Sequence, residues 1–305
     1  MTDDRLKASL DAVRAREDLR ARRDADPVSF VHRYRNDDDR EIVALVAACL
    51  ALGNVKAIRA KIALLLERID PSPAKAADDP KTLFRKLEGF QHRFFKGEDV
   101  ARLLVGARKV QKKHGSLGHA FARAVEAADA LDLEDEEAFR EGLALFCDEI
   151  RKAGGLPSPG EKSERRGPVH LLSNARAGSA AKRSFLFLRW MIRKKDGIDL
   201  GLWSDLIPAS RLVMPLDVHI HKLARNLGLT RRKDLSWRTA IEVTKGLARF
   251  DPRDPTRYDF SLCHLGMVQR CPSKRDAARC EGCGVRPVCI HWKTRRSGSD
   301  PAART

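Results

Sequence analysis

Apolar side chains recur at helical spacing along most of the chain. Over residues 55–69 they return every three or four positions, which lines one face of a helix, and Asn54 stands in front as an N-cap. The segment 185–191 is so apolar that its helix is expected to be buried. The same periodicity predicts further helices, over residues 42–49 behind a capping acidic run at 37–39, over 98–112, and over 220–227 before Gly228. Alternating patterns typical of strands are scarce, so the fold class is predicted to be all-α.

Three segments interrupt the helical pattern. Residues 71–80 are rich in Ala, Asp and Pro, and residues 154–167 read as an exposed basic loop. The tail from residue 293 is expected to be disordered. The chain has 305 residues, of which 43% are hydrophobic, so it is long enough for two domains with a real core.

The charge balance adds a candidate partner. Lys and Arg number 59 against 42 Asp and Glu, which gives a net charge of +17 and a pI near 9.9. Such a surface favours a polyanion such as nucleic acid, although a basic proteome would give the same excess. No apolar stretch approaches the ~20 residues of a membrane span, and the charged N-terminus lacks the apolar core of a signal peptide. We therefore expect a cytoplasmic, nucleoid-associated protein.

Four of the seven cysteines cluster near the C-terminus, at Cys271, Cys280, Cys283 and Cys289. In a cytosolic protein such a cluster favours a metal over disulfides. A zinc ribbon usually carries two Cys-x2-Cys pairs, whereas here one close pair is flanked by two more distant thiols. That spacing favours a four-iron four-sulfur ([4Fe-4S]) cluster, with zinc as the alternative.

The cysteine spacing resembles the C-terminal cluster loop of the endonuclease III and adenine-mismatch glycosylase group, within the helix–hairpin–helix (HhH-GPD) DNA glycosylase superfamily. The first gap is eight residues here, where the group usually has six, and the insertion adds Lys274 and Arg275. In that group the loop between the first two ligands is basic and contacts the DNA backbone. The resemblance therefore implies that Lys274 and Arg275 are DNA contacts.

A second motif supports the same resemblance. Residues 215–229 are similar to the superfamily's Val-Asp-Thr-His motif and the helix that follows it. The resemblance implies that Asp217 is catalytic, with its carboxylate stabilising the positive charge that develops on the sugar. A carboxylate there would also cap the helix, and capping alone is the alternative role of Asp217. His219 matches the motif histidine, and a structural role is expected for it.

The third motif is weaker. Residues 178–183 resemble the superfamily hairpin Leu-Pro-Gly-x-Gly-x-Lys at Gly178 and Lys182, but Ala180 replaces the second glycine and the Leu-Pro pair is absent. The resemblance implies that Lys182 is the nucleophile. It also implies a phosphate-binding segment, made of Gly178, Ser179, Ala180 and Arg183. Taken alone, this segment favours the alternative in which Lys182 is a solvated lysine at a helix start.

Residues 89–96 look like the superfamily's Gly-aromatic loop, which implies that Gln91 and His92 lie at the substrate pocket. The 35-residue gap between Lys182 and Asp217 is closer to archaeal 8-oxoguanine DNA glycosylase than to endonuclease III. The whole pattern, which spans about residues 26–289, resembles a bacterial family of unassigned activity related to that archaeal enzyme.

The resemblance implies a bifunctional DNA glycosylase and AP lyase. It would be a monomer acting on double-stranded DNA with a damaged or modified base, an oxidised purine such as 8-oxoguanine being favoured. Two helical domains with a cleft between them are expected, one over residues 45–215 and an iron–sulfur domain formed by residues 1–44 with 216–292, followed by a disordered basic tail over 293–305. The alternatives are a DNA-binding protein that has lost the chemistry, and an iron–sulfur nuclease, for which no strand carrying an Asp is evident.

Overall fold

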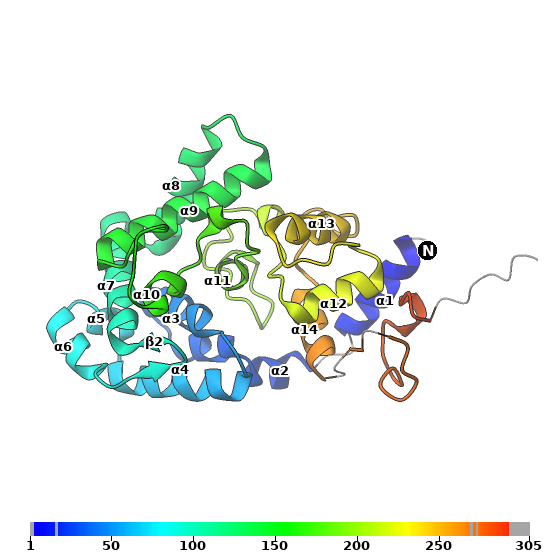
Figure 1. Cartoon of the computed structure of the whole chain (residues 1–305), viewed down its shortest axis with the longest axis horizontal. Coiled ribbons are helices and arrows are strands. Elements are labelled where there is room, and N and C mark those ends of the chain that lie inside the picture. The colour runs from blue at the N-terminus through cyan, green and yellow to red at the C-terminus, as the bar shows by residue number, and fades with distance from the viewer. Residues whose placement is uncertain (1–2, 16–17, 269–270, 273, 293–305) are drawn as a thin grey trace, which may run out of the picture. The chain divides into compact units, whose positions relative to one another are not determined.

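The computed structural model describes residues 3–15, 18–268, 271–272 and 274–292 of the chain (Figure 1). It is 61% helix with few strands, which confirms the predicted all-α class. The tail predicted to be disordered, residues 293–305, lies outside the described residues. No helix in the described part of the chain is long and apolar enough to cross a membrane.

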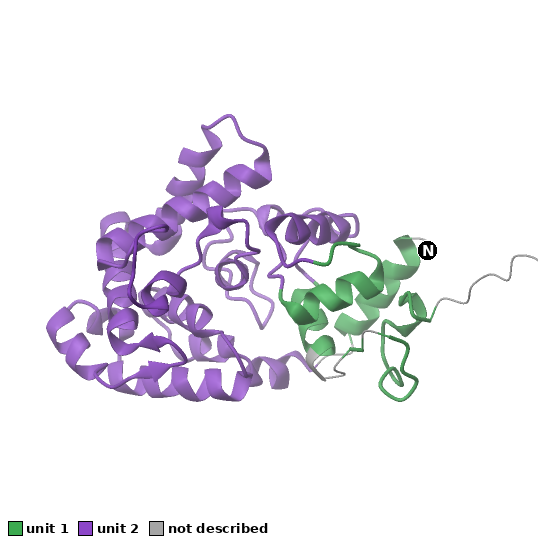
Figure 2. Ribbon diagram, viewed as in Figure 1, with its two compact units in different colours: residues 1–17, 217–233, 258–305 green, residues 18–216, 234–257 purple. Residues whose placement is uncertain are grey.

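The chain divides into two compact units, coloured separately in Figure 2. Unit 2, the larger, comprises residues 18–216 and 234–257. Unit 1 comprises residues 1–17, 217–233 and 258–305.

The elements of unit 2 are, in chain order, α2 (Leu19–Ala25), η1 (Pro27–Arg33), α3 (Asp37–Leu50), α4 (Val55–Ile69), α5 (Pro73–Ala76), α6 (Pro80–Lys86), β1 (Gln91–His92), β2 (Phe95–Lys96), α7 (Gly97–His114), α8 (Leu117–Asp129), α9 (Asp135–Gly154), α10 (Arg166–Leu171), η2 (Ala175–Ala177), α11 (Lys182–Ile192), η3 (Ala209–Arg211) and α13 (Trp237–Ala248). Those of unit 1 are α1 (Asp3–Ala15), α12 (Val218–Leu227), α14 (Asp259–Val268) and η4 (Arg286–Val288). The two strands pair antiparallel as a short hairpin, with Gln91 opposite Lys96 and His92 opposite Phe95.

Local signals set most helix ends. The Asn54 side chain accepts a hydrogen bond from the Lys56 N–H at 2.9 Å and caps α4, as predicted. Gly228 ends α12 in the left-handed conformation at φ 75°, also as predicted. The cap of α3 differs from the prediction. It is Asn36, whereas the three aspartates 37–39 occupy the first turn, where their charge favours the helix N-terminus.

Helix α11 runs through the core of unit 2 and packs against α3. Phe185, Leu188 and Trp190 are fully buried, which confirms the burial predicted from their apolar segment. A buried carboxylate supports the same core, since Glu41 accepts hydrogen bonds from the Trp203 indole at 2.7 Å and from the backbone at the start of α8. Those donors satisfy a charge that would otherwise be costly to bury.

The observed units group two stretches differently from the sequence prediction. Residues 18–44 and 234–257 were expected in the cluster domain but belong to unit 2. The first stretch packs there because η1 lies against α3 and α4. The second is held by Trp237, whose backbone N–H donates to the Gly178 carbonyl at 2.8 Å and whose ring stacks on Phe185 with the ring centres 5.6 Å apart.

Unit 1 joins the first helix to the C-terminal third of the chain. The Tyr258 hydroxyl donates to the Asp11 carboxylate at 2.7 Å, and α1 packs against η4. Glycine at position 284 allows α1 to pack this closely, because a Cβ there would lie 2.5 Å from the Val13 side chain. Helix α12 packs on α14 in the same unit.

Candidate functional site

The four C-terminal cysteines face one pocket in unit 1. Its lining combines the thiols with apolar and basic side chains, namely Leu223, Asn226, Cys271, Pro272, Arg279, Cys280, Cys283, Val285, Arg286, Cys289, His291 and Trp292. Leu223 and Asn226 come from α12, so this helix forms one wall. Four convergent thiols are a donor set that fits a metal or an iron–sulfur cluster.

The thiols also influence one another electrostatically. Burial raises the pKa of Cys271, and the nearby Cys283, Cys289 and Cys280 raise it further. A cationic centre would reverse this penalty by stabilising the thiolates. Among the described side chains, no set of three or more His, Cys, Asp or Glu groups is arranged to hold a single metal ion.

Two arginines lie against Trp292, which lines this pocket. The guanidinium groups of Arg275 and Arg286 lie 4.2 Å and 4.0 Å from the centre of the Trp292 ring, within the range of cation–π attraction. Arg275 was predicted to contact DNA, and the structure gives it this aromatic partner. Its neighbour Lys274 is exposed.

Asp217 lies at the other end of the helix that lines the pocket. Its Oδ1 accepts hydrogen bonds from the N–H groups of His219 and Ile220, both at 2.9 Å, and so caps α12. The side chain is only partly buried. The capping role expected from the sequence is therefore present, and it holds the carboxylate in one orientation. His219 is exposed, while the His221 ring is bonded to the Arg232 carbonyl at 3.0 Å.

The segment before Lys182 is a tight turn in unit 2. The three-residue helix η2 precedes it, Gly178 has φ 76°, and Ala181 takes the left-handed conformation at φ 42°. A non-glycine residue in that region is strained, which often accompanies a functional constraint. Lys182 then begins α11 and is partly exposed. Gly178 and Ser179 are exposed and Ala180 is buried.

Sequence reasoning missed Asp26, a carboxylate within electrostatic reach of Lys182. Burial raises the pKa of Asp26, and a hydrogen bond from the Val28 N–H at 2.9 Å opposes the rise. The positive charges of Arg189 and Lys182 act in the same opposing direction. No local signal could have identified this pair, because 156 positions of sequence separate Asp26 from Lys182.

The Arg183 side chain makes its contacts within unit 2. Its guanidinium donates to the carbonyls of Cys49, His170 and Leu171 and lies over the Phe95 ring at 5.6 Å. Burial lowers the pKa of Arg183. These contacts join the ends of α3 and α10 to the β1–β2 hairpin. They also occupy N–H groups of Arg183 that the predicted phosphate contact would use.

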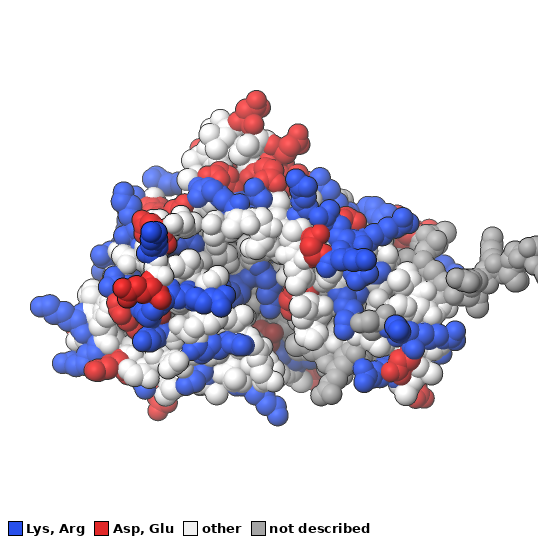
Figure 3. Space-filling model, viewed as in Figure 1, with Lys and Arg blue, Asp and Glu red and all other residues white. Residues whose placement is uncertain are grey.

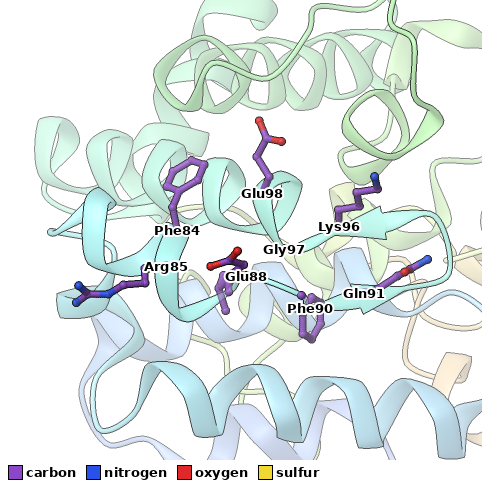
Figure 4. A pocket seen from close by; sticks show the side chains of 10 residues that line it. Phe84, Arg85, Glu88, Phe90, Gln91, Lys96, Gly97 and Glu98 are labelled. Atoms are coloured by element: carbon purple, nitrogen blue, oxygen red, sulfur yellow. The ribbon is translucent and has the colours of Figure 1, made fainter.

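The two residues predicted at a substrate pocket point to different places. Gln91 lines a pocket of about 440 Å³ in unit 2, shown in Figure 4, whose walls come from α6, the hairpin and the start of α7. His92 does not line it. The His92 ring is buried and bonded to the Leu50 carbonyl at 3.0 Å, and burial lowers its pKa.

The turn of the hairpin presents an aromatic side chain that sequence reasoning also missed. Arg93 has φ 54°, and the following Phe94 is 36% exposed. Phe94 meets the edge of the His170 ring at 5.9 Å, and the Arg166 guanidinium lies 5.8 Å from its ring centre. The His92–Leu50 bond fixes the base of this hairpin, so Phe94 projects from a supported turn.

Together these features define an all-α protein with a four-cysteine pocket in one unit and a strained, lysine-bearing turn in the other. The chain belongs to the family described as Protein of unknown function (DUF2400), whose family model matches residues 26–268. The four clustered cysteines lie just beyond the matched residues. No curated protein and no solved structure matches the chain.

Proposed function

We propose that this chain is a bifunctional DNA glycosylase and AP lyase that removes a damaged or modified base, with an oxidised purine such as 8-oxoguanine as the favoured substrate. The observation that carries the proposal is that helix α12 connects the Asp217 carboxylate to the cysteine pocket. It begins at the capping carboxylate of Asp217 and lines the cysteine pocket with Leu223 and Asn226. This pairing agrees with the resemblance to the helix–hairpin–helix glycosylases, which rests on the same two motifs.

In this proposal Asp217 acts on the sugar. Cleavage of an N-glycosidic bond builds positive charge on the sugar ring, and a fixed carboxylate stabilises that charge. The base must leave the helical stack before its bond can break. Because two backbone N–H groups hold the Asp217 carboxylate, little reorganisation is needed when the charge develops.

Lys182 would complete the lyase step. Its neutral amine attacks C1′ as the bond to the base breaks, and the departing base takes up a proton. Loss of the amine's second proton with opening of the sugar ring gives an imine. Removal of a C2′ proton then expels the 3′ phosphate, and hydrolysis of the imine releases the lysine. The left-handed Ala181 would set the direction in which Lys182 leaves the turn.

The cysteine set Cys271, Cys280, Cys283 and Cys289 would hold a [4Fe-4S] cluster that supplies structural support rather than catalysis. Their shared pocket supports this assignment. Zinc remains the alternative cofactor.

Exposed basic residues in unit 1 suit the proposed DNA partner. Residues with exposed side chains on and after α12 are Lys222, Arg225, Arg231 and Lys233. They would contact phosphates. Figure 3 shows Lys and Arg side chains spread among acidic ones over the visible face.

A second candidate is a DNA-binding protein that retains the fold without the chemistry. The observation that favours it is the degenerate hairpin, with the short helix η2 and with Ala180 in place of the glycine. The nuclease alternative has less support, since it needs a strand-borne Asp and the two described strands carry none.

The proposal is tested by anaerobic purification followed by incubation with lesion-bearing duplexes and borohydride. A covalent protein–DNA adduct together with base release on at least one lesion supports it. Intact DNA binding with neither signal across oxidised, alkylated and modified bases would favour the non-catalytic alternative.

Replacing Cys280 with serine is expected to remove the visible absorption of the cluster and most of the bound iron, which should be ~4 per chain in the native protein. The Cys263→Ser variant is the matched control, because Cys263 lies on α14 in the same unit and does not line the pocket. Iron and sulfide analysis distinguishes the cofactors, since zinc without sulfide in the native protein would contradict the cluster.

Replacing Phe94 with alanine is expected to weaken binding to lesion-bearing DNA. An exposed ring beside Arg166 can stack on bases or fill the gap that a flipped base leaves, and such stacking contributes about 1–3 kcal/mol, or roughly 5–150-fold in Kd. Leu131→Ala is the control, since it removes an exposed apolar side chain elsewhere on unit 2. Equal affinities of the two variants would show that Phe94 does not contact DNA.

A further inference from the structure

One buried amide connects the two ends of the cysteine segment. Asn226, on α12, is 6% exposed. Its Nδ2 lies 3.2 Å from the Cys271 sulfur and 3.2 Å from the Pro272 carbonyl, and its Oδ1 lies 3.1 Å from the His291 Nε2. The backbone carbonyl of Asn226 also accepts from the Ile290 N–H at 2.8 Å. The residue thus contacts the first cysteine and the residues that follow the last one.

The orientation of this amide follows from its partners. The Pro272 carbonyl can only accept a hydrogen bond, and a ligating cysteine sulfur is likewise an acceptor. Only the NH2 end of Asn226 satisfies both, and its two N–H groups allow one bond to each. Its oxygen is then directed at the His291 ring.

We infer that Asn226 positions Cys271 and raises the reduction potential of the bound cluster by donating an N–H group to the Cys271 sulfur. The inference rests on the [4Fe-4S] cluster of the proposed function. A hydrogen bond draws electron density from a ligating sulfur, so it stabilises the reduced form of the centre more than the oxidised form. The same bond holds the ligand in place, as outer partners of metal ligands commonly do.

The position is specific within α12. Leu223 also faces the pocket but has no polar hydrogen to donate, whereas Lys222 and Arg225 are exposed and do not line it. The Asn226–Cys271 hydrogen bond joins a ligand cysteine to this helix.

The test compares Asn226→Leu, which removes the donor at similar size, with Asn226→Gln, which keeps an amide. The reduction potential is measured by protein-film voltammetry, and the Fe–S(Cys) stretching frequencies by resonance Raman. For Asn226→Leu we expect a lower potential, a higher stretching frequency and a cluster lost to chelator roughly 10-fold faster. For Asn226→Gln we expect values between those of the Leu variant and the native protein. Val218→Ala, at an exposed position of the same helix, should leave all three unchanged.

The outcomes separate this inference from the proposal beneath it. A native protein without iron and sulfide overturns this inference together with the [4Fe-4S] assignment on which it rests, while the glycosylase activity is judged by the borohydride adduct. A native cluster whose potential and Raman spectrum are the same in Asn226→Leu overturns the role of Asn226 alone. If Asn226→Leu does not fold by circular dichroism, Asn226→Ala takes its place with the same expectations.

Discussion

Replacement of Lys182 by alanine is expected to abolish the borohydride-trapped adduct and strand cleavage on a substrate lesion, with rates falling by on the order of 10³-fold or more. The reason is chemical, because the imine requires a primary amine at C1′ and the turn before α11 presents this one. Lys182→Arg is the sharper variant. Arginine keeps the positive charge for any phosphate contact but cannot form the imine, so it should bind DNA and give no adduct.

The controls for this prediction use other lysines. Lys194 is exposed just beyond the end of α11, and Lys194→Ala should trap as the native protein does. An adduct of undiminished yield in Lys182→Arg would mean that another amine attacks the sugar. The hairpin resemblance would then have no catalytic meaning, whatever the cluster does.

The parts of the fold that the sequence predicted correctly depend on neighbours in the chain. The burial of α11 follows from a continuous apolar run, and the start and stop of α12 follow from one capping residue and one glycine. Both are set by interactions within a few positions. The cap of α3 was misplaced by one residue because Asn36 and the adjacent aspartates are all good caps, and propensity alone does not rank them.

Features that depend on distant contacts could not be predicted from the sequence. Asp26 comes near Lys182 only because η1 packs in unit 2, and Trp237 draws residues 234–257 into the same unit by stacking on Phe185. His92 has the right place in its motif but turns inward to the Leu50 carbonyl. A motif specifies which residues lie on a turn, whereas the surrounding core decides which of their side chains face solvent.

The cysteine pocket likewise combines a feature that the sequence predicted with contacts that it did not. Spacing predicted that the four thiols act together, and they do face one pocket. The identity of the residues around them did not follow from spacing. Asn226 is 45 positions from Cys271, and the guanidinium group of the exposed Arg275 lies over the Trp292 ring.

The Asp217→Asn variant separates the two proposed roles of the Asp217 carboxylate, which are to cap α12 and to stabilise positive charge on the sugar. Asparagine and aspartate are about equally good N-caps, whereas alanine is poor. The free energy of unfolding of Asp217→Asn should therefore lie within about 0.5 kcal/mol of the native value, and that of Asp217→Ala should be ~1 kcal/mol lower. Both variants lack the negative charge at the sugar. We therefore expect the rate of base excision to fall by roughly 10²–10³-fold in each variant. The rate is measured in single turnover on a lesion that gives the borohydride adduct with the native protein.

The comparison of these two variants is informative because stability and rate respond to different properties of the side chain. Ser116→Ala, which removes the cap of α8 by breaking its bond to the His119 N–H, should lower stability without changing excision. If Asp217→Asn excised the base at the native rate, capping would be the whole function of Asp217. The α12 geometry would then have no bearing on catalysis, even with the cluster in place. A large rate loss at unchanged stability can come only from the missing charge, since the helix that holds it is still capped.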